Sequence, residues 1–214
     1  LSEAVREHIP PGTPLALRVF GHRQADACRT DLEIPLAPLN PESAATTIAG
    51  IQAMNLARTP IAASLAAVES DLKGAGGRAA IVLVTDGEET CEGDPAAVIE
   101  ALQEKGIELN LNIVGFAIGD AELEAQFESW ADLSGGRYFS AQNQQGLSEA
   151  LREALRIPFA VYDAGGNEVA RGLVGGEPVE IEQGIYRVDV ASTPPRTFEA
   201  VDVPGEKSVT LRLE

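Results

Sequence analysis

Basic residues are scarce in this chain of 214 residues, and their scarcity limits its possible partners. Lysine and arginine together number 16 against 33 aspartates and glutamates, which gives a net charge of −17. Such a surface offers no basic footprint for the phosphates of a nucleic acid, and anionic membrane surfaces repel it. No apolar stretch approaches the roughly 20 residues that a membrane-spanning helix needs. We therefore expect no nucleic-acid partner and no membrane insertion.

Signatures of catalysis are also missing. The sequence contains neither the G-x-S-x-G turn of hydrolases nor the G-x-x-x-x-G-K-[ST] loop that binds nucleotide phosphates. The glycine-rich segment 74–77 precedes a predicted strand, whereas a phosphate-binding loop follows one. Glu88 and Glu89 are adjacent, so their side chains diverge, and we interpret them as a solvated face. His22 has no evident Ser or Cys partner and is interpreted as structural. The sequence therefore does not indicate an enzyme.

Cysteine and histidine are equally rare, with two of each in the chain. A zinc site built on thiolates usually needs more cysteines or well-spaced histidines, and His8 and His22 do not supply that spacing. Two possibilities remain for Cys28 and Cys91: a single disulfide or two free thiols.

What the chain does contain, over residues 1–156, is an alternation of strand and helix signals. The run AAIVLV at 79–84 is continuously apolar and lies between glycines and a turn, which is typical of a strand buried on both faces. Such an alternation predicts an α/β domain with a Rossmann-like, mostly parallel sheet and helices on both faces. We expect 79–84 to be a central strand, and 15–20 and 31–36 to pair as an antiparallel hairpin at one edge. Strands are predicted at 15–20, 31–36, 79–84, 109–118 and 137–140, and helices at 41–54, 60–72, 94–105, 121–133 and 146–155.

The pattern changes at residue 157. From there to residue 214 no helical period is visible, and short β-rich runs are separated by Gly or Pro turns. This predicts two domains, an α/β domain at 1–156 and a small antiparallel β domain at 157–214. A domain of that size is marginal alone, so we expect it to pack on its neighbour. Strands are expected at 158–162, 168–173, 184–190, 198–203 and 208–213, with a hairpin turn at 165–167.

Two oxygen-bearing side chains mark a candidate metal site. Asp86 directly follows the run at 79–84, where open α/β sheets bind ligands. Thr59 lies between two predicted helices, in a loop that could reach the same edge. A hydroxyl and a carboxylate are oxygen ligands suited to Mg²⁺. The alternative interpretation is that Asp86 forms the turn after the strand, while Thr59 is the N-cap of a helix that begins at Pro60.

Three segments resemble a von Willebrand factor A-type domain: IVLVTDGEE at 81–89, RTPI at 58–61 and LSGGRY at 133–138. The resemblance is strongest to a bacterial subgroup with a GHR…C segment (FGHR at 20–23, then Cys28) and TDGEETC (85–91), and it covers residues 1–156. It implies that Thr59 and Asp86 are the second and third elements of a metal-ion-dependent adhesion site. The first element, D-x-S-x-S, is absent. Its strand would then precede Leu1, and the site in this chain would be partial.

The same resemblance bears on the cysteines and on location. Cys28 and Cys91 both follow strands at the carboxyl edge, and the missing strand would separate those strands by two spacings, roughly 10 Å. Loops can close that distance, so we favour a Cys28–Cys91 disulfide and an extracytoplasmic location. The first residue is leucine instead of methionine, which indicates a mature, trimmed or fragmentary chain.

Three functions are left open by the sequence. The resemblance favours a non-enzymatic adhesion or protein-binding module that uses Mg²⁺ and a protein ligand presenting an acidic group. The second is a metal-independent scaffold of the same fold, and the third, least favoured, is a phosphate-using α/β enzyme. The second domain resembles small prealbumin-like or carboxypeptidase-regulatory-like sandwiches, which act as spacers or stabilisers.

Overall fold

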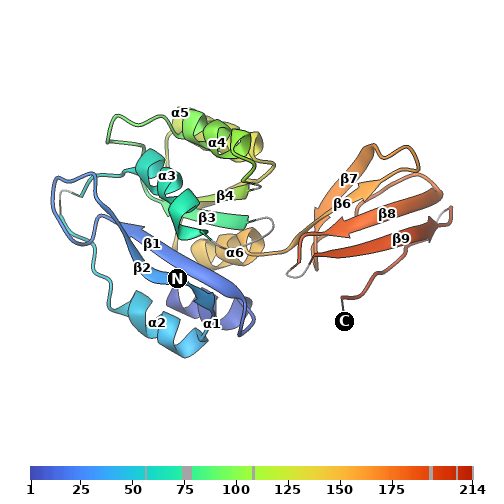
Figure 1. Ribbon diagram of the computed structural model, residues 1–214, viewed down its shortest axis with the longest axis horizontal. Coiled ribbons are helices and arrows are strands. Elements are labelled where there is room, and N and C mark those ends of the chain that lie inside the picture. The colour runs from blue at the N-terminus through green and yellow to red at the C-terminus, as the bar shows by residue number, and fades with distance from the viewer. Residues whose placement is uncertain (56, 74–78, 108, 193–194, 206, 214) are drawn as a thin grey trace. The chain divides into compact units, whose positions relative to one another are not determined.

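The structure is a computed structural model, and it divides into two compact units, Leu1–Leu155 and Arg156–Glu214 (Figure 1). It describes residues 1–55, 57–73, 79–107, 109–192, 195–205 and 207–213. The sequence analysis excluded the glycine-rich segment 74–77 as a phosphate-binding loop, and this segment lies outside the described residues. None of the described helices is both long and apolar enough to cross a membrane.

The first unit is a mixed α/β structure built on two sheets. A parallel sheet has the strand order β3–β4–β5, and an antiparallel pair consists of β1 and β2. The strands are β1 (Pro14–Phe20), β2 (Thr30–Pro38), β3 (Ala79–Thr85), β4 (Leu109–Phe116) and β5 (Tyr138–Ala141). The helices are α1 (Ser2–His8), α2 (Pro41–Ala49), α3 (Ile61–Asp71), α4 (Pro95–Glu104), α5 (Ala121–Leu133) and α6 (Gln144–Ala154).

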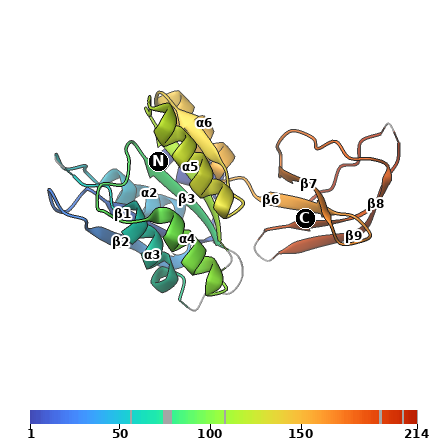
Figure 2. The ribbon, with the colours of Figure 1, turned by 90° about the horizontal axis from the view of Figure 1, so that it is seen from above.

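Helices cover both faces of the parallel sheet, as predicted. Side chains of α3, α4 and α5, including the large residues Ile61, Ile99 and Phe127, form one core with alternate residues of β3 and β4. On the opposite face, α1 and α6 contribute Ala4 and Leu151 to a second core. Figure 1 shows α3, α4 and α5 above the strands and α1 and α6 below them. From above, in Figure 2, α3, α4 and α5 lie side by side.

The predicted hairpin is present, but the predicted central strand is wrong. β1 pairs antiparallel with β2, with Phe20 opposite Thr30. β3 instead forms the outer strand of its sheet: within the described ranges it pairs only with β4, and β1 pairs only with β2. Ala80 of β3 is exposed, whereas β4 is buried at every position except its second and last. The strand buried on both faces is therefore β4.

Both sheets are nevertheless held between the same helices. Helix α3 contacts β1 and β2, and Phe20 of β1 joins the core that α3 forms with β3. On the other face, Val5 of α1 packs with Leu15 of β1, while Ala4 packs with Val82 of β3. β1 and β3 thus lie within one layered unit while their neighbouring edges are not paired to each other.

Local capping explains where most of these helices begin. Asn40, Asp94, Asp120 and Asn143 each precede a helix and accept a hydrogen bond from an amide in its first turn. Pro95 occupies the first position of α4, as the sequence predicted. Each of these helices has a start signal in its own sequence.

Helix α3 has no side-chain cap of this kind, and the predicted N-cap role of Thr59 is wrong. The helix begins at Ile61, and Pro60 at the cap position has a ψ of 68°, outside the helical region. The amide of Ala62 in the first turn is bound instead by a side chain from the loop after β3. This contact forms part of the candidate site.

The second unit is one antiparallel sheet with strand order β7–β6–β8–β9. Its strands are β6 (Pro158–Tyr162), β7 (Glu168–Leu173), β8 (Gly184–Val190) and β9 (Arg196–Val203). Val161, Val188 and Val190 form the buried centre of its core. In the predicted hairpin turn, Asp163 accepts a hydrogen bond from the amide of Asn167 at 2.8 Å.

The expected strand at 208–213 is absent. Those residues adopt no regular structure, and Val209, Leu211 and Leu213 remain 38–41% exposed. The alternation of apolar residues is real, but these side chains are not part of the core cluster of the unit. A strand needs a partner edge as well as an alternating pattern.

Candidate functional site

The two predicted metal ligands lie on loops that are joined to each other. Asp86 directly follows β3 and is exposed, and Thr59 precedes α3 and is half-buried. The Thr59 amide donates to the Thr90 hydroxyl at 2.7 Å, and the Thr90 amide donates to the Thr59 carbonyl at 3.1 Å. Thr90 belongs to the loop that begins with Asp86. Because these bonds use only the main chain of Thr59, they leave its hydroxyl available.

The turn after β3 is held by Thr85 and not by Asp86. The buried Thr85 hydroxyl donates to the Gly87 carbonyl at 2.8 Å and lies 3.3 Å from the Gly87 amide. The side chain of Asp86 is therefore not the group that closes this turn. Asp86 contributes to the lining of a cavity of about 210 Å³, together with Phe20, Val84, Thr85, Phe116 and Leu147.

Glu89 corrects the interpretation of the two adjacent glutamates as a solvated face. Glu88 is exposed, as expected, but Glu89 is half-buried. Its two carboxylate oxygens accept from the Ala62 amide at 2.7 Å and from the Cys91 amide at 2.6 Å. No local sequence signal indicated this role, because Ala62 lies 27 residues before Glu89.

The predicted disulfide is confirmed. Cys28 and Cys91 are bonded, and their Cα atoms lie 5.7 Å apart. The bond links the loop after β1 to the loop after β3. The loops at the carboxyl ends of β1 and β3, which belong to separate sheets, are therefore covalently connected beside the candidate site.

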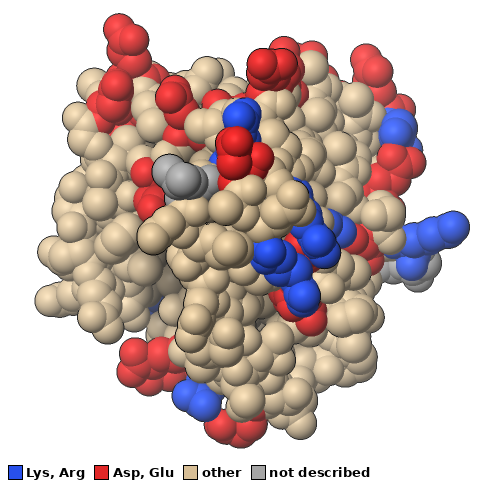
Figure 3. All heavy atoms as spheres, turned by 90° about the vertical axis from the view of Figure 1, so that its left-hand side faces the viewer, with Lys and Arg blue, Asp and Glu red and all other residues tan. Residues whose placement is uncertain are grey.

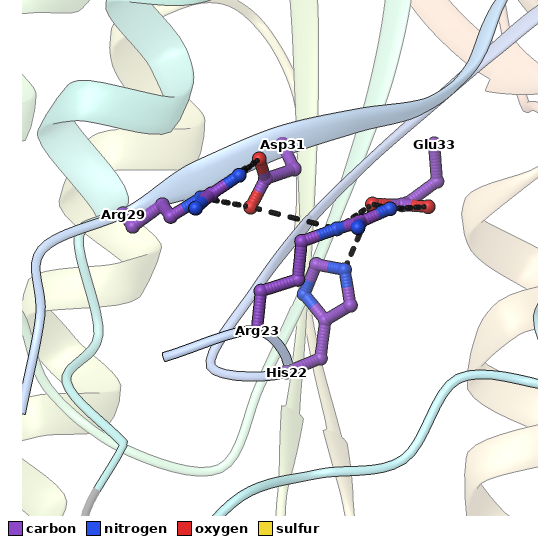
Figure 4. Close-up of polar contacts among 5 residues, drawn as sticks. All are labelled: His22, Arg23, Arg29, Asp31 and Glu33. Atoms are coloured by element: carbon purple, nitrogen blue, oxygen red, sulfur yellow. Dashed lines mark hydrogen bonds and ion pairs between the residues drawn. The ribbon is translucent and has the colours of Figure 1, made fainter. Parts of the chain in front are cut away.

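A second polar cluster surrounds His22, at the carboxyl end of β1 (Figure 4). The His22 Nε2 atom lies 2.9 Å from a Glu33 oxygen, and Arg23 donates to both oxygens of Glu33 at 2.7 and 2.8 Å. Arg29 pairs with Asp31 in the same way, at 2.7–2.9 Å. The hydrogen bonds from His22 and Arg23 hold the pKa of Glu33 below its ordinary value, and Arg29 lowers the pKa of Asp31.

Geometry alone would allow this cluster to bind a metal, but its charges favour a structural role. Potential ligand atoms of His22, Asp31 and Glu33 lie within 4.8 Å of one another. Both carboxylates, however, already pair with arginine, so a cation would have to displace Arg23 and Arg29 to reach them. The network therefore fixes the loop between β1 and β2. Asp31 and Glu33 are two residues apart on one strand, which places them on one face. This spacing is the sequence signal from which the acidic half of the His22 cluster could be predicted.

Basic residues on this side of the unit lie against acidic ones. Figure 3 shows lysines and arginines beside aspartates and glutamates on this face. Arg58, next to Thr59, forms such a pair with Asp26 at 2.7 Å. The charge of Arg58 beside Thr59 is thus compensated by Asp26.

The fold is that of von Willebrand factor A-type domains. Proximal thread matrix protein 1 of the mussel byssus, solved with a zinc-occupied MIDAS motif, matches 72% of this chain with a TM-score of 0.57 and 16% identity. A von Willebrand factor type A protein of Catenulispora acidiphila matches 94% of the chain with a TM-score of 0.55 and 11% identity. The chain spans only 37% of the mussel protein and 59% of the Catenulispora protein. Similarity at these identities establishes a shared fold and no shared ligand.

A curated relative defines the family. The chain is 34% identical over 154 residues to the uncharacterized protein YwmD of Bacillus subtilis, an alignment that covers 67% of each protein. No family model matches the chain. The chain belongs to the family of YwmD.

Proposed function

We propose that this protein is a non-enzymatic protein-interaction module that binds its partner at the carboxyl edge of the sheet through a divalent cation. The observation that carries the proposal is the reciprocal pair of hydrogen bonds between Thr59 and Thr90. It ties the loop of Asp86 to the segment of Thr59 and leaves both ligand side chains out of that contact. The mussel protein, which shares the fold, holds zinc at its MIDAS motif.

The proposed ion is Mg²⁺, with the Thr59 hydroxyl and the Asp86 carboxylate among its ligands. Mg²⁺ requires a nearly octahedral set of oxygens, and two protein oxygens are too few to hold it firmly. The remaining protein oxygens would come from a D-x-S-x-S segment on a strand upstream of Leu1. This chain alone should therefore bind Mg²⁺ weakly or not at all.

The arrangement of the two sheets supports a place for that strand between β1 and β3. Neither β1 nor β3 has a partner on its second edge within the described ranges. Helices α1 and α3 contribute to cores that include residues of both strands. The cavity beside Asp86 is lined by the last residue of β1 (Phe20) and the last residue of β3 (Thr85), so it would lie at the carboxyl end of the inserted strand. A strand inserted there would lie about 4.8 Å from each of its two neighbours.

The cation also explains how so acidic a protein would bind an acidic ligand. With a net charge of −17 and an exposed carboxylate at Asp86, the bare edge repels an anionic group. A bound Mg²⁺ reverses the local charge and keeps coordination positions for oxygens from a partner. We therefore expect a protein ligand that presents an Asp or Glu side chain.

Location and the second unit complete the proposal. The disulfide between Cys28 and Cys91 favours an oxidising compartment, outside the cytoplasm. The second unit would serve as a prealbumin-like spacer or stabiliser, and the match to the Catenulispora protein over 94% of the chain continues into it.

A metal-independent scaffold is the competing function, and one observation favours it. The loops of Thr59 and Asp86 are already held by Thr90, Glu89 and the disulfide, so they need no ion to be ordered. A phosphate-using enzyme is disfavoured, because the carboxylate of Glu89 occupies the N-terminus of α3 and would repel a phosphate there.

Calorimetric titration with Mg²⁺ separates the two functions. It is performed on the full-length protein, including the native sequence upstream of Leu1, and on its Asp86→Ala and Thr59→Ala variants. Glu88→Ala is the matched control, because Glu88 is an exposed carboxylate of the same loop. We expect Mg²⁺ binding by the wild type and the control, and its loss in Asp86→Ala. Identical titrations for the wild type and Asp86→Ala would establish the scaffold instead.

A further inference from the structure

Three consecutive residues of the loop after β3 each bind a different part of the first unit. Glu89 accepts from the amide of Ala62 in the first turn of α3. Thr90 exchanges two hydrogen bonds with the main chain of Thr59. Cys91 is bonded to Cys28 in the loop after β1. The loop that starts at Asp86 is thus attached at three points immediately after its candidate ligand.

Among these three residues, Glu89 is the one whose contacts depend on a carboxylate side chain. Its two oxygens accept from two amides, one on α3 and one on its own loop at Cys91. The two amides bind different oxygens of Glu89, and a carboxamide in its place would turn an NH2 donor toward one of them. The negative charge is also favourable at the N-terminus of a helix, where first-turn amides lack partners. Glutamate therefore fits this position better than glutamine does.

Close packing shows that loop and helix are in direct contact at this point. A Cβ atom placed on Gly93 would lie 2.4 Å from the Cβ of Ala62. That distance is shorter than any real carbon contact, so only glycine allows the loop to approach α3 this closely. The same Ala62 donates its amide to Glu89, so the polar and the steric contacts fix one point of the helix.

We infer that Glu89 is a positioning residue, which fixes Thr59 relative to Asp86 by joining the start of α3 to the loop of Asp86. Its consequence for metal affinity rests on the proposed function. Thr59 lies three residues before Ala62, and Asp86 three residues before Glu89. Without the carboxylate, the polar link between α3 and this loop is lost, and the spacing of the two ligand segments depends on the Thr59–Thr90 pair and on the packing of Gly93 against Ala62. Mg²⁺ tolerates little departure from octahedral geometry at about 2.1 Å, so a loosened pair of segments should bind it less well.

Amide hydrogen exchange on the full-length protein tests the positioning without any ion. The variants are Glu89→Ala and Glu89→Gln, and Glu88→Ala is the matched control. In Glu89→Ala we expect exchange at the amides of Ala62 and Thr59 to rise about tenfold or more, as loss of a hydrogen bond to a charged group predicts. Glu89→Gln should lie between Glu89→Ala and the wild type.

A local effect must be distinguished from general destabilisation. The amides of Leu111 and Ile113, in the buried strand β4, should keep their wild-type exchange rates in Glu89→Ala. Unchanged exchange at Ala62 and Thr59, or an equal rise at β4, would overturn the inference. The control should leave both regions unchanged.

Mg²⁺ titration of the same proteins then separates the inference from the proposed function. If the wild type binds Mg²⁺, Glu89→Ala should bind it about tenfold more weakly, since a lost charged hydrogen bond corresponds to at least that factor. Equal affinity of Glu89→Ala and the wild type would overturn the positioning role. If the wild type does not bind Mg²⁺, the proposed function fails, while a local rise in exchange still supports positioning of Thr59 by Glu89.

Discussion

Arg18 and Asp71 form an ion pair with two hydrogen bonds that joins strand β1 to the end of helix α3. The guanidinium donates to the two carboxylate oxygens at 2.7 and 2.6 Å, and the side chains are 18% and 9% exposed. The hydrogen bonds to Asp71 also raise the pKa of Arg18. Because β1 pairs with no strand of the parallel sheet in the described part of the chain, this ion pair helps to hold β1 in the unit.

Substitution of Asp71 should therefore destabilise the first unit. Asp71→Asn leaves the guanidinium of Arg18 partly buried without a charged partner, and should lower the free energy of unfolding by about 2–4 kcal/mol. Urea denaturation followed by the fluorescence of Trp130, the single tryptophan, reports on this unit alone. The control is Glu69→Ala, which breaks the exposed pair with Lys105 and should cost less than about 1 kcal/mol. Equal effects of the two variants would show that the Arg18 pair contributes no more than a surface pair.

Asn112 joins the buried strand β4 to the end of α6 and to the segment before β5. Its side-chain amide donates to the Ala154 carbonyl at 2.7 Å, and its oxygen accepts from the Arg137 amide at 3.0 Å. Asn112→Ala should destabilise the first unit by about 2–4 kcal/mol, because a buried carbonyl and a partly buried amide of the main chain lose their partner. Asn110→Ala is the matched control, since Asn110 is on the same strand and makes one exposed hydrogen bond. A urea midpoint for Asn112→Ala equal to that of the control would contradict this role.

Elements with local signals were predictable from the sequence. Helix α4 follows Asp94-Pro95, an N-cap and a first-position proline, and begins at Pro95. Helix α5 was expected at 121–133 and spans Ala121–Leu133. The Cys28–Cys91 bond was predicted because the order of strands implied by the family resemblance brings both cysteines to one edge. In each case the feature could be predicted from neighbouring residues or from the order of strands that the family resemblance implies.

Features that depend on distant partners were not predictable. The run at 79–84 is as apolar as a central strand, yet β3 is an outer strand, because the second neighbour of a strand is not encoded within it. Glu89 resembled its exposed neighbour Glu88 until α3 supplied the amide of Ala62. The pairing of Thr59 with Thr90 likewise joins residues 31 positions apart.

The His22 network should make the first unit sensitive to acid. Its hydrogen bonds hold the pKa of Glu33 below the ordinary value, with His22 the larger cause and Arg23 the next. Between that lowered pKa and the ordinary value of about 4.3, the unfolded chain binds more protons than the folded protein. This contribution to stability is thus present above the ordinary value and is lost as the pH falls through the lowered one.

Glu33→Gln tests this contribution. The variant should be less stable than the wild type near neutral pH, and the difference should shrink as the pH falls below about 4. Urea midpoints from Trp130 fluorescence, measured from about pH 3 to about pH 7, give the comparison. Glu88→Gln removes an exposed carboxylate and should follow the wild-type curve. A constant difference between Glu33→Gln and the wild type at every pH would exclude titration of Glu33 as the cause.

The Cys28–Cys91 disulfide should stabilise the first unit more than any single hydrogen bond described above. It closes a loop with a sequence separation of 63 residues, and the chain-entropy estimate for such a loop is about 4 kcal/mol. Reduction, or the double substitution Cys28→Ala with Cys91→Ala, should shift the urea midpoint of the Trp130 signal to lower concentration. The double variant should be insensitive to reductant, which shows that the reductant acts only on this bond. An unchanged midpoint after complete reduction would mean that non-covalent contacts, such as the pair of Arg58 with Asp26 in the loop after β1, suffice without the covalent link.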